Sequence, residues 1–104
     1  MIRIALFCAA GMSTSMLVNK MRASAKEKGI EADIEAYPES SLQKKLEEGI
    51  DIALLGPQVR FKLTASKALC EPKGVPVEVI DTRDYGMMKG DNVLARVLEI
   101  LGEK

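Results

Sequence analysis

The residue best suited to chemistry in this sequence is Cys8, which ends an apolar run and precedes small and hydroxyl-bearing residues. A thiolate is a strong nucleophile, and the start of a helix offers unpaired N–H groups and a positive dipole end that favour negative charge. Small side chains let these N–H groups approach a ligand, and Gly11 permits a left-handed backbone conformation. The segment therefore predicts an anion-binding loop with Cys8 as the carrier of a phosphoryl group.

Backbone dipoles fixed around such a loop stabilise the equatorial oxygens of a transferring phosphoryl group without reorganisation. The residues expected to bind phosphate around the catalytic Cys8 are Ala9, Ala10, Gly11, Met12, Ser13, Thr14 and Ser15. A plainer interpretation makes Cys8 a small buried apolar residue and lets the serines cap a helix. The spacing matches neither GxGxxG nor a Walker loop, which disfavours nucleotide binding.

Short apolar runs alternate with amphipathic segments along the chain, and this pattern predicts the elements that place Cys8. The expected strands cover 2–7, 31–36, 50–55 and 75–80, and the expected helices lie around 17–25, 41–48, 59–69 and 91–102. Alternating strands and helices predict an α/β fold, an open βαβ sandwich with a four-stranded parallel sheet and helices on both faces. For the strands we expect the order 2-1-3-4. The second strand alternates polar and apolar residues, so we expect it at an edge.

In an open parallel sheet the ligand site lies beyond the carboxyl ends of the strands, where Cys8 falls. Candidate partner contacts at this edge are Met12, Met16, Gly56, Pro57 and Gln58. Methionines make adaptable contact surfaces, although Met16 also suits a core position, and Gly-Pro is ordinary turn chemistry. Asp81 and Asp84 follow the fourth strand, and we interpret them as solvated loop charges because carboxylates repel phosphate.

Composition limits the other functions that this chain of 104 residues can have. Fifteen basic and fifteen acidic residues cancel, so nucleic acid is a poor partner. The chain has no histidine and no metal-ligand cluster, and we expect no cofactor. Two distant cysteines without a CxxC pair suggest a reduced cytoplasmic protein in which Cys70 has no special role. We expect a single domain over residues 1–104 that is a monomer in isolation.

Three segments together resemble the IIB components of the bacterial sugar phosphotransferase system, in the lactose/cellobiose (diacetylchitobiose) class. They are LFCAAGMSTSMLV at 6–18, LLGPQV at 54–59 and VPVEVID at 75–81. The resemblance implies that Cys8 accepts phosphate from a phosphohistidine on a IIA partner. It also implies transfer to a sugar of the cellobiose/chitobiose-like β-glucoside class, bound by a membrane IIC partner during import.

Two alternatives use the same sheet edge. A low-molecular-weight tyrosine phosphatase or arsenate reductase also opens with a cysteine loop, but that class needs the arginine of C-x5-R, and the corresponding position is Thr14. A flavin- or nucleotide-binding module is the other alternative. The loop lacks the aromatic residues that would stack on such a ligand.

Overall fold

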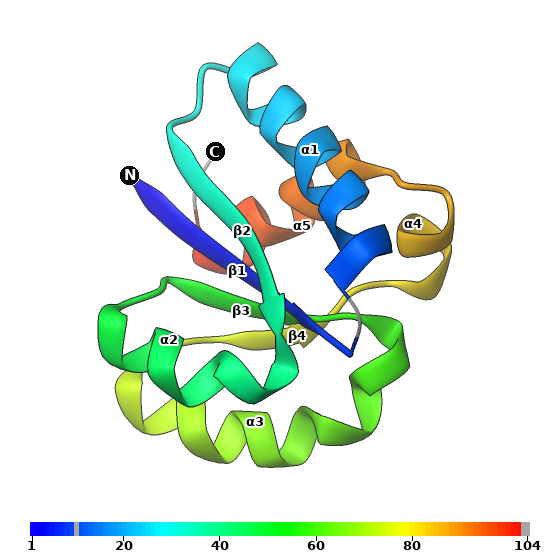
Figure 1. Cartoon of the computed structure of the whole chain (residues 1–104). Helices are drawn as coiled ribbons and strands as arrows, with labels where there is room; N and C mark the ends of the chain where they lie inside the picture. The colour runs from blue at the N-terminus through cyan, green and yellow to red at the C-terminus, as the bar shows by residue number, and fades with distance from the viewer. Residues whose placement is uncertain (10, 103–104) are drawn as a thin grey trace.

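A four-stranded parallel sheet organises the chain, with strands in the order β2-β1-β3-β4 (Figure 1). The computed structural model describes residues 1–9 and 11–102, with residues 11–13 described by their backbone. The strands are β1 (Ile2–Cys8), β2 (Ala32–Pro38), β3 (Ile52–Leu55) and β4 (Val77–Val79). The predicted strand order and the edge position of the second strand are confirmed. The fourth strand is shorter than expected.

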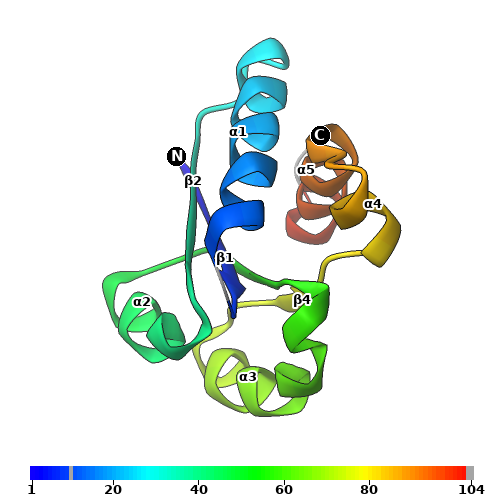
Figure 2. The same ribbon diagram turned by 45° about the vertical axis from the view of Figure 1, so that its right-hand side comes forward.

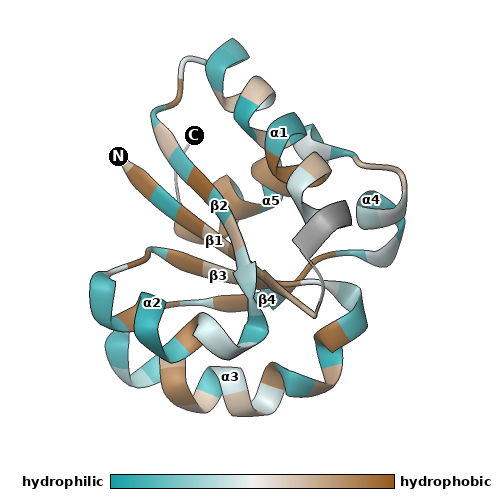
Figure 3. Ribbon diagram, viewed as in Figure 1, coloured by the Kyte–Doolittle hydropathy of each residue, from teal (hydrophilic) through white to brown (hydrophobic). Residues whose placement is uncertain are grey.

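Successive side chains of a strand point to opposite faces, and here both faces of the central strands are covered. Ile4 and Leu6 of β1 pack into one apolar cluster, whereas Ala5 and Phe7 pack into the other. This two-sided burial explains the nearly continuous hydrophobic run at the start of the chain. Figure 3 shows mostly apolar colours on the central strands β1 and β3, whereas polar and apolar bands alternate along the edge strand β2.

Three helices cover one face of the sheet: α1 (Gly11–Glu27), α4 (Thr82–Gly86) and α5 (Gly90–Leu101). α1 and α5 pack side by side (Figure 2). They come close together at Gly90, where an added Cβ atom would lie 2.5 Å from the carbonyl carbon of Lys20. Glycine at this position is therefore required by the contact between the two helices.

The opposite face carries α2 (Leu42–Glu48) and α3 (Leu63–Cys70). Short 3-10 segments join them to the sheet: η1 (Glu39–Ser41), η2 (Pro57–Lys62) and η3 (Glu71–Lys73). The predicted helix over 59–69 is therefore wrong in its first part. Val59 is buried with a backbone φ of −115°, outside the helical region, so the regular α-helix begins only at Leu63.

Helix α4 was not expected from the sequence. Asp81 is exposed, as expected for a solvated charge, but it has a structural role, and Asp84 lies within the helix and not in a loop. The Asp81 side chain caps this helix by accepting hydrogen bonds from the N–H groups of Arg83, at 2.9 Å, and Asp84, at 3.1 Å. Asp84 in turn accepts a hydrogen bond from the side-chain amide of Asn92 on α5. Among the described residues, no helix has both the length and the apolar character needed to cross a bilayer.

Candidate active site

Cys8 is the last residue of the central strand β1 and lies just before the N-terminus of α1. It is aligned with Pro38 at the end of β2, so the loop that follows leaves the sheet at its carboxyl edge. Only 2% of Cys8 is exposed. The thiol therefore occupies the position where an open parallel sheet and a helix start together favour an anion.

The segment after β3 lies beside Cys8 at the carboxyl edge of the sheet. The Gly56 N–H donates a hydrogen bond to the carbonyl of Phe7 at 2.9 Å, which joins the ends of β3 and β1. A Cβ atom at Gly56 would lie 3.4 Å from the Cβ of Cys8 and 2.9 Å from Oε1 of Gln58. Gly56 thus lies directly beside the thiol, and the Gln58 side chain lies over Gly56.

Thr14 ends the first turn of α1, and its side chain is fully buried. Its Oγ1 lies 3.0 Å from Oη of Tyr85, which belongs to α4 and is 8% exposed. The Thr14 hydroxyl therefore pairs with a side chain of α4, and its expected role as a donor to phosphate stays a prediction.

The remaining candidate residues differ in exposure, and some of them lie outside the described part of the chain. Ala9 and Ser15 are exposed, and 59% of Met16 is exposed, so Met16 is a surface residue and not part of the core. Pro57 is half-buried at the start of η2, and Gln58 is exposed. Ala10 lies outside the described residues, as do the side chains of Met12 and Ser13, whereas Gly11 is described as the first residue of α1.

Cys70 lies in a different environment from Cys8. It is the last residue of α3 and is completely buried in the apolar cluster that contains Phe7, Leu55 and Val59. Burial raises the pKa of the Cys70 thiol because the charged form would lose its hydration. A thiol in this environment stays protonated and is a poor nucleophile.

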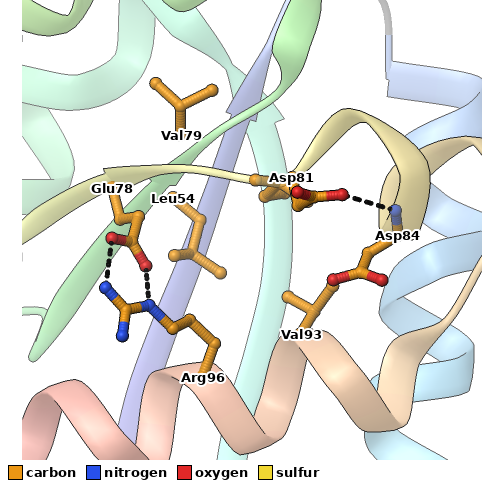
Figure 4. A pocket seen from close by; sticks show the side chains of 8 residues that line it. Leu54, Glu78, Val79, Asp81, Asp84, Val93 and Arg96 are labelled. Atoms are coloured by element: carbon orange, nitrogen blue, oxygen red, sulfur yellow. Dashed lines mark hydrogen bonds and ion pairs between the residues drawn. The ribbon is translucent and has the colours of Figure 1, made fainter.

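A cavity of about 370 Å³ is lined by residues of β3, β4, α4 and α5 and of the segment between β4 and α4 (Figure 4). Its polar wall contains Glu78, Asp81 and Asp84, and Arg96 makes two hydrogen bonds to the Glu78 carboxylate, at 2.6 and 3.0 Å. The carboxylates disfavour a phosphate here, so this cavity adds nothing to a phosphoryl site. In the described part of the chain, no group of His, Cys, Asp and Glu side chains could hold a metal ion.

Sequence reasoning missed Tyr85, which contacts the start of α1 from α4. One signal was available, because Asp81 and Asp84 have the spacing of a helix N-cap and its third residue. Such a cap predicts a short helix that carries Tyr85. The pairing of Tyr85 with Thr14, by contrast, depends on how α4 packs on α1, which no local pattern reveals.

Comparison with known proteins gives a consistent result. Residues 3–96 match the family described as "PTS system, Lactose/Cellobiose specific IIB subunit". A galactose-specific EIIB component from Lactococcus lactis subsp. cremoris is 47% identical over 96 residues, covering 88% of this chain and 89% of the relative. A cellobiose-specific EIIB component from Lactococcus lactis subsp. lactis is 46% identical over 96 residues, with the same coverage.

The solved structures agree on the fold. The lactose-specific IIB domain from Streptococcus pneumoniae superposes with a TM-score of 0.84 over 94% of this chain and 95% of that chain, at 19% identity. The four-stranded parallel sheet with helices on both faces is therefore the architecture of a solved IIB domain. Together with the family match over residues 3–96, these findings show that the chain belongs to the lactose/cellobiose-specific IIB family of the sugar phosphotransferase system.

Proposed function

We propose that Cys8 carries a phosphoryl group between two partners, a IIA protein that donates it from a phosphohistidine and a membrane IIC protein that presents the sugar. The observation that carries this proposal is the position of Cys8, at the end of the central strand, before the N-terminus of α1 and beside Gly56. No other described thiol has such surroundings, since Cys70 lies in an apolar cluster at the end of a helix.

The first step forms a bond between the sulfur of Cys8 and phosphorus and breaks the bond between phosphorus and the imidazole nitrogen of the donor. The thiol loses its proton, and the donor imidazole gains one. The backbone N–H groups around residues 9–15 and the positive end of the α1 dipole stabilise the three equatorial oxygens as the group moves. Catalysis at this step depends on positioning and needs no cofactor.

The second step breaks the sulfur–phosphorus bond and forms a bond from phosphorus to a hydroxyl oxygen of the sugar, whose proton passes to the leaving thiolate or to solvent. The thiolate of Cys8 is the leaving group, and the same loop stabilises the phosphoryl oxygens. Cys8 is thus first a nucleophile and then a leaving group, while energy and substrate both arrive on partners. This reaction is the work of a phosphotransferase component at the cytoplasmic side of the membrane.

The surface around Cys8 suits contact with two different proteins in turn. Met16 is an exposed flexible apolar side chain near the start of α1, and Gln58 is an exposed amide beside Gly56. We assign Met16, Gly56, Pro57 and Gln58 to the partner contact, together with Met12. A thioether side chain can adapt to both partners, as a carrier with alternating contacts requires.

We place the sugar in the cellobiose/chitobiose-like β-glucoside class. The two relatives compared above carry the names galactose-specific and cellobiose-specific at nearly equal identity, so similarity alone does not choose between them. In the proposed reaction the sugar is bound by the IIC partner, and the choice of sugar therefore depends on that protein.

Intact-protein mass spectrometry after incubation with a phosphorylated IIA protein tests this function. The wild-type protein and the matched control Cys70→Ser should each gain the mass of one phosphoryl group. Cys8→Ser should gain none while keeping its circular dichroism spectrum. Phosphorylation of the Cys8→Ser protein would refute the proposal.

A further inference from the structure

We infer that Tyr85 is a positioning residue for phosphoryl transfer, acting through Thr14 on the first turn of α1. This inference rests on the proposed function of Cys8 and adds to it a residue that neither touches the phosphate nor belongs to the Cys8 loop. The observation is the 3.0 Å contact between Oη of Tyr85 and Oγ1 of Thr14, buried between α4 and α1.

Burying two hydroxyl groups between helices costs free energy, because both groups lose their hydration. Only the hydrogen bonds that they form offset this loss. Tyr85 belongs to a hydrophobic cluster that also contains Leu17, Val18 and Leu94. An apolar pair would pack there without that loss. A directional bond fixes the relative orientation of two elements more narrowly than apolar packing, and here one of these elements begins at the Cys8 loop.

The position of Thr14 makes that orientation matter for the reaction. The first N–H groups of a helix have no partner within it and are the donors available to an anion. Thr14 follows directly after residues 11–13 of this first turn. Displacement of the turn would displace those donors from the phosphoryl oxygens, and misplacement by about 1 Å can cost a factor of about 100 in rate.

Tyr85 is itself held firmly, as a positioning residue must be. Asp81 caps the start of α4, and the Asn92 amide on α5 donates to Asp84. After the helix, Met88 adopts a left-handed backbone conformation with φ of 53° and packs against the same core cluster. That conformation costs a non-glycine residue about 1 kcal/mol, so the surrounding packing must hold this turn in place.

The test compares Tyr85→Phe, which removes one hydroxyl group, with Tyr37→Phe, which does the same on the other tyrosine. Tyr37 packs against Phe7 in the apolar cluster on the opposite face of the sheet. Rapid-quench mass spectrometry follows phosphoryl acceptance from phosphorylated IIA protein at several donor concentrations. For Tyr85→Phe we expect the rate at saturating donor to fall about tenfold, with an unchanged half-saturating concentration, because Tyr85 lies behind the site. Tyr37→Phe should match wild type.

Variants at Thr14 separate positioning from a loss of stability. Thr14→Ser keeps the hydroxyl and should retain most of the rate, whereas Thr14→Val should lose about as much as Tyr85→Phe. The double variant Tyr85→Phe/Thr14→Val should be no slower than either single variant, because both remove one interaction. All rates are compared per folded protein, measured by circular dichroism at the assay temperature.

The inference is overturned if Tyr85→Phe accepts phosphate at the wild-type rate per folded protein. It is also overturned if the effects of Tyr85→Phe and Thr14→Val add independently. If wild-type protein accepts phosphate, Cys8→Ser does not and Tyr85→Phe matches wild type, only the role of Tyr85 fails. Phosphorylation of Cys8→Ser would instead remove the proposed function itself.

Discussion

The regions around the two cysteines differ in ways that burial alone does not reveal, since Cys8 is 2% exposed and Cys70 is not exposed. Cys8 ends a strand and precedes the N-terminus of α1, whereas Cys70 is the last residue of α3. A helix dipole favours negative charge at its N-terminus and opposes it at its C-terminus. The same side chain is therefore suited to carry a phosphate at one position and to remain a packed thiol at the other.

The neighbours of the two thiols strengthen this contrast. Cys8 lies at the carboxyl edge of the sheet, next to Gly56, where a Cβ atom would come within 3.4 Å of the Cys8 Cβ. Cys70 is surrounded by side chains of the apolar cluster on the α2 and α3 face. The features that distinguish the proposed reactive cysteine from the other are therefore the backbone groups and the helix end beside it.

The largest expected effect concerns the lifetime of phosphorylated Cys8. A carrier must resist water, and the position six residues after Cys8, where cysteine phosphatases have their arginine, is Thr14, bonded to Tyr85. Without a guanidinium, attack by water receives less charge stabilisation. We expect the phosphoprotein to decay at least about 100 times faster with membranes containing sugar-bound IIC partner than in buffer alone.

Phosphoprotein remaining after quenching at successive times measures this decay, and the same membranes without sugar are the control. Equal decay in buffer and with sugar-bound membranes would show that the protein hydrolyses its own phosphocysteine, as a phosphatase does. Steady turnover of an aryl phosphate by the wild-type protein would have the same meaning.

The sequence predicted most of the strands and helices around Cys8, but it did not predict the side-chain contacts between these elements. The strands, the edge position of the second strand and the place of Cys8 at a strand end follow from apolar runs and their spacing, which are local signals. The Thr14 hydroxyl was expected to face the loop, whereas its partner Tyr85 lies 71 positions away in the chain and on a helix that was not expected. Such long-range pairing depends on how helices pack, and the pattern of either segment alone does not encode it.

The next effect concerns the packing of α1, which begins beside the Cys8 loop. Gly90→Ala should lower the free energy of unfolding by about 1–3 kcal/mol, because the new methyl group would overlap the backbone of Lys20 and Met21. Gly86→Ala is the matched control, since nothing lies within 4 Å of a Cβ atom there. Urea denaturation measures both variants, and equal stability of the two would contradict the close helix contact.

The smallest expected effect belongs to Cys70. Cys70→Ala should leave phosphoryl acceptance unchanged and cost about 1 kcal/mol through lost packing. Because burial raises the pKa of Cys70, the folded state keeps this proton at pH values where the unfolded state has released it. Wild-type stability should therefore fall as the pH rises above the ordinary cysteine pKa.

The alanine variant lacks that titrating group, so its loss of stability at alkaline pH should be shallower than that of wild type. Urea denaturation at several pH values compares the two slopes. Identical slopes would show that ionisation of Cys70 is not coupled to folding.

The central claim is that one of two buried thiols carries the phosphoryl group, and it is tested most directly in the unaltered protein. Wild-type protein is incubated with phosphorylated IIA protein, digested under conditions that preserve phosphocysteine and analysed by fragment mass spectrometry. We expect phosphate on the peptide that contains Cys8, localised to that residue, and unmodified Cys70. Phosphate on Cys70 or on a hydroxyl residue such as Ser15, with Cys8 unmodified, would contradict it.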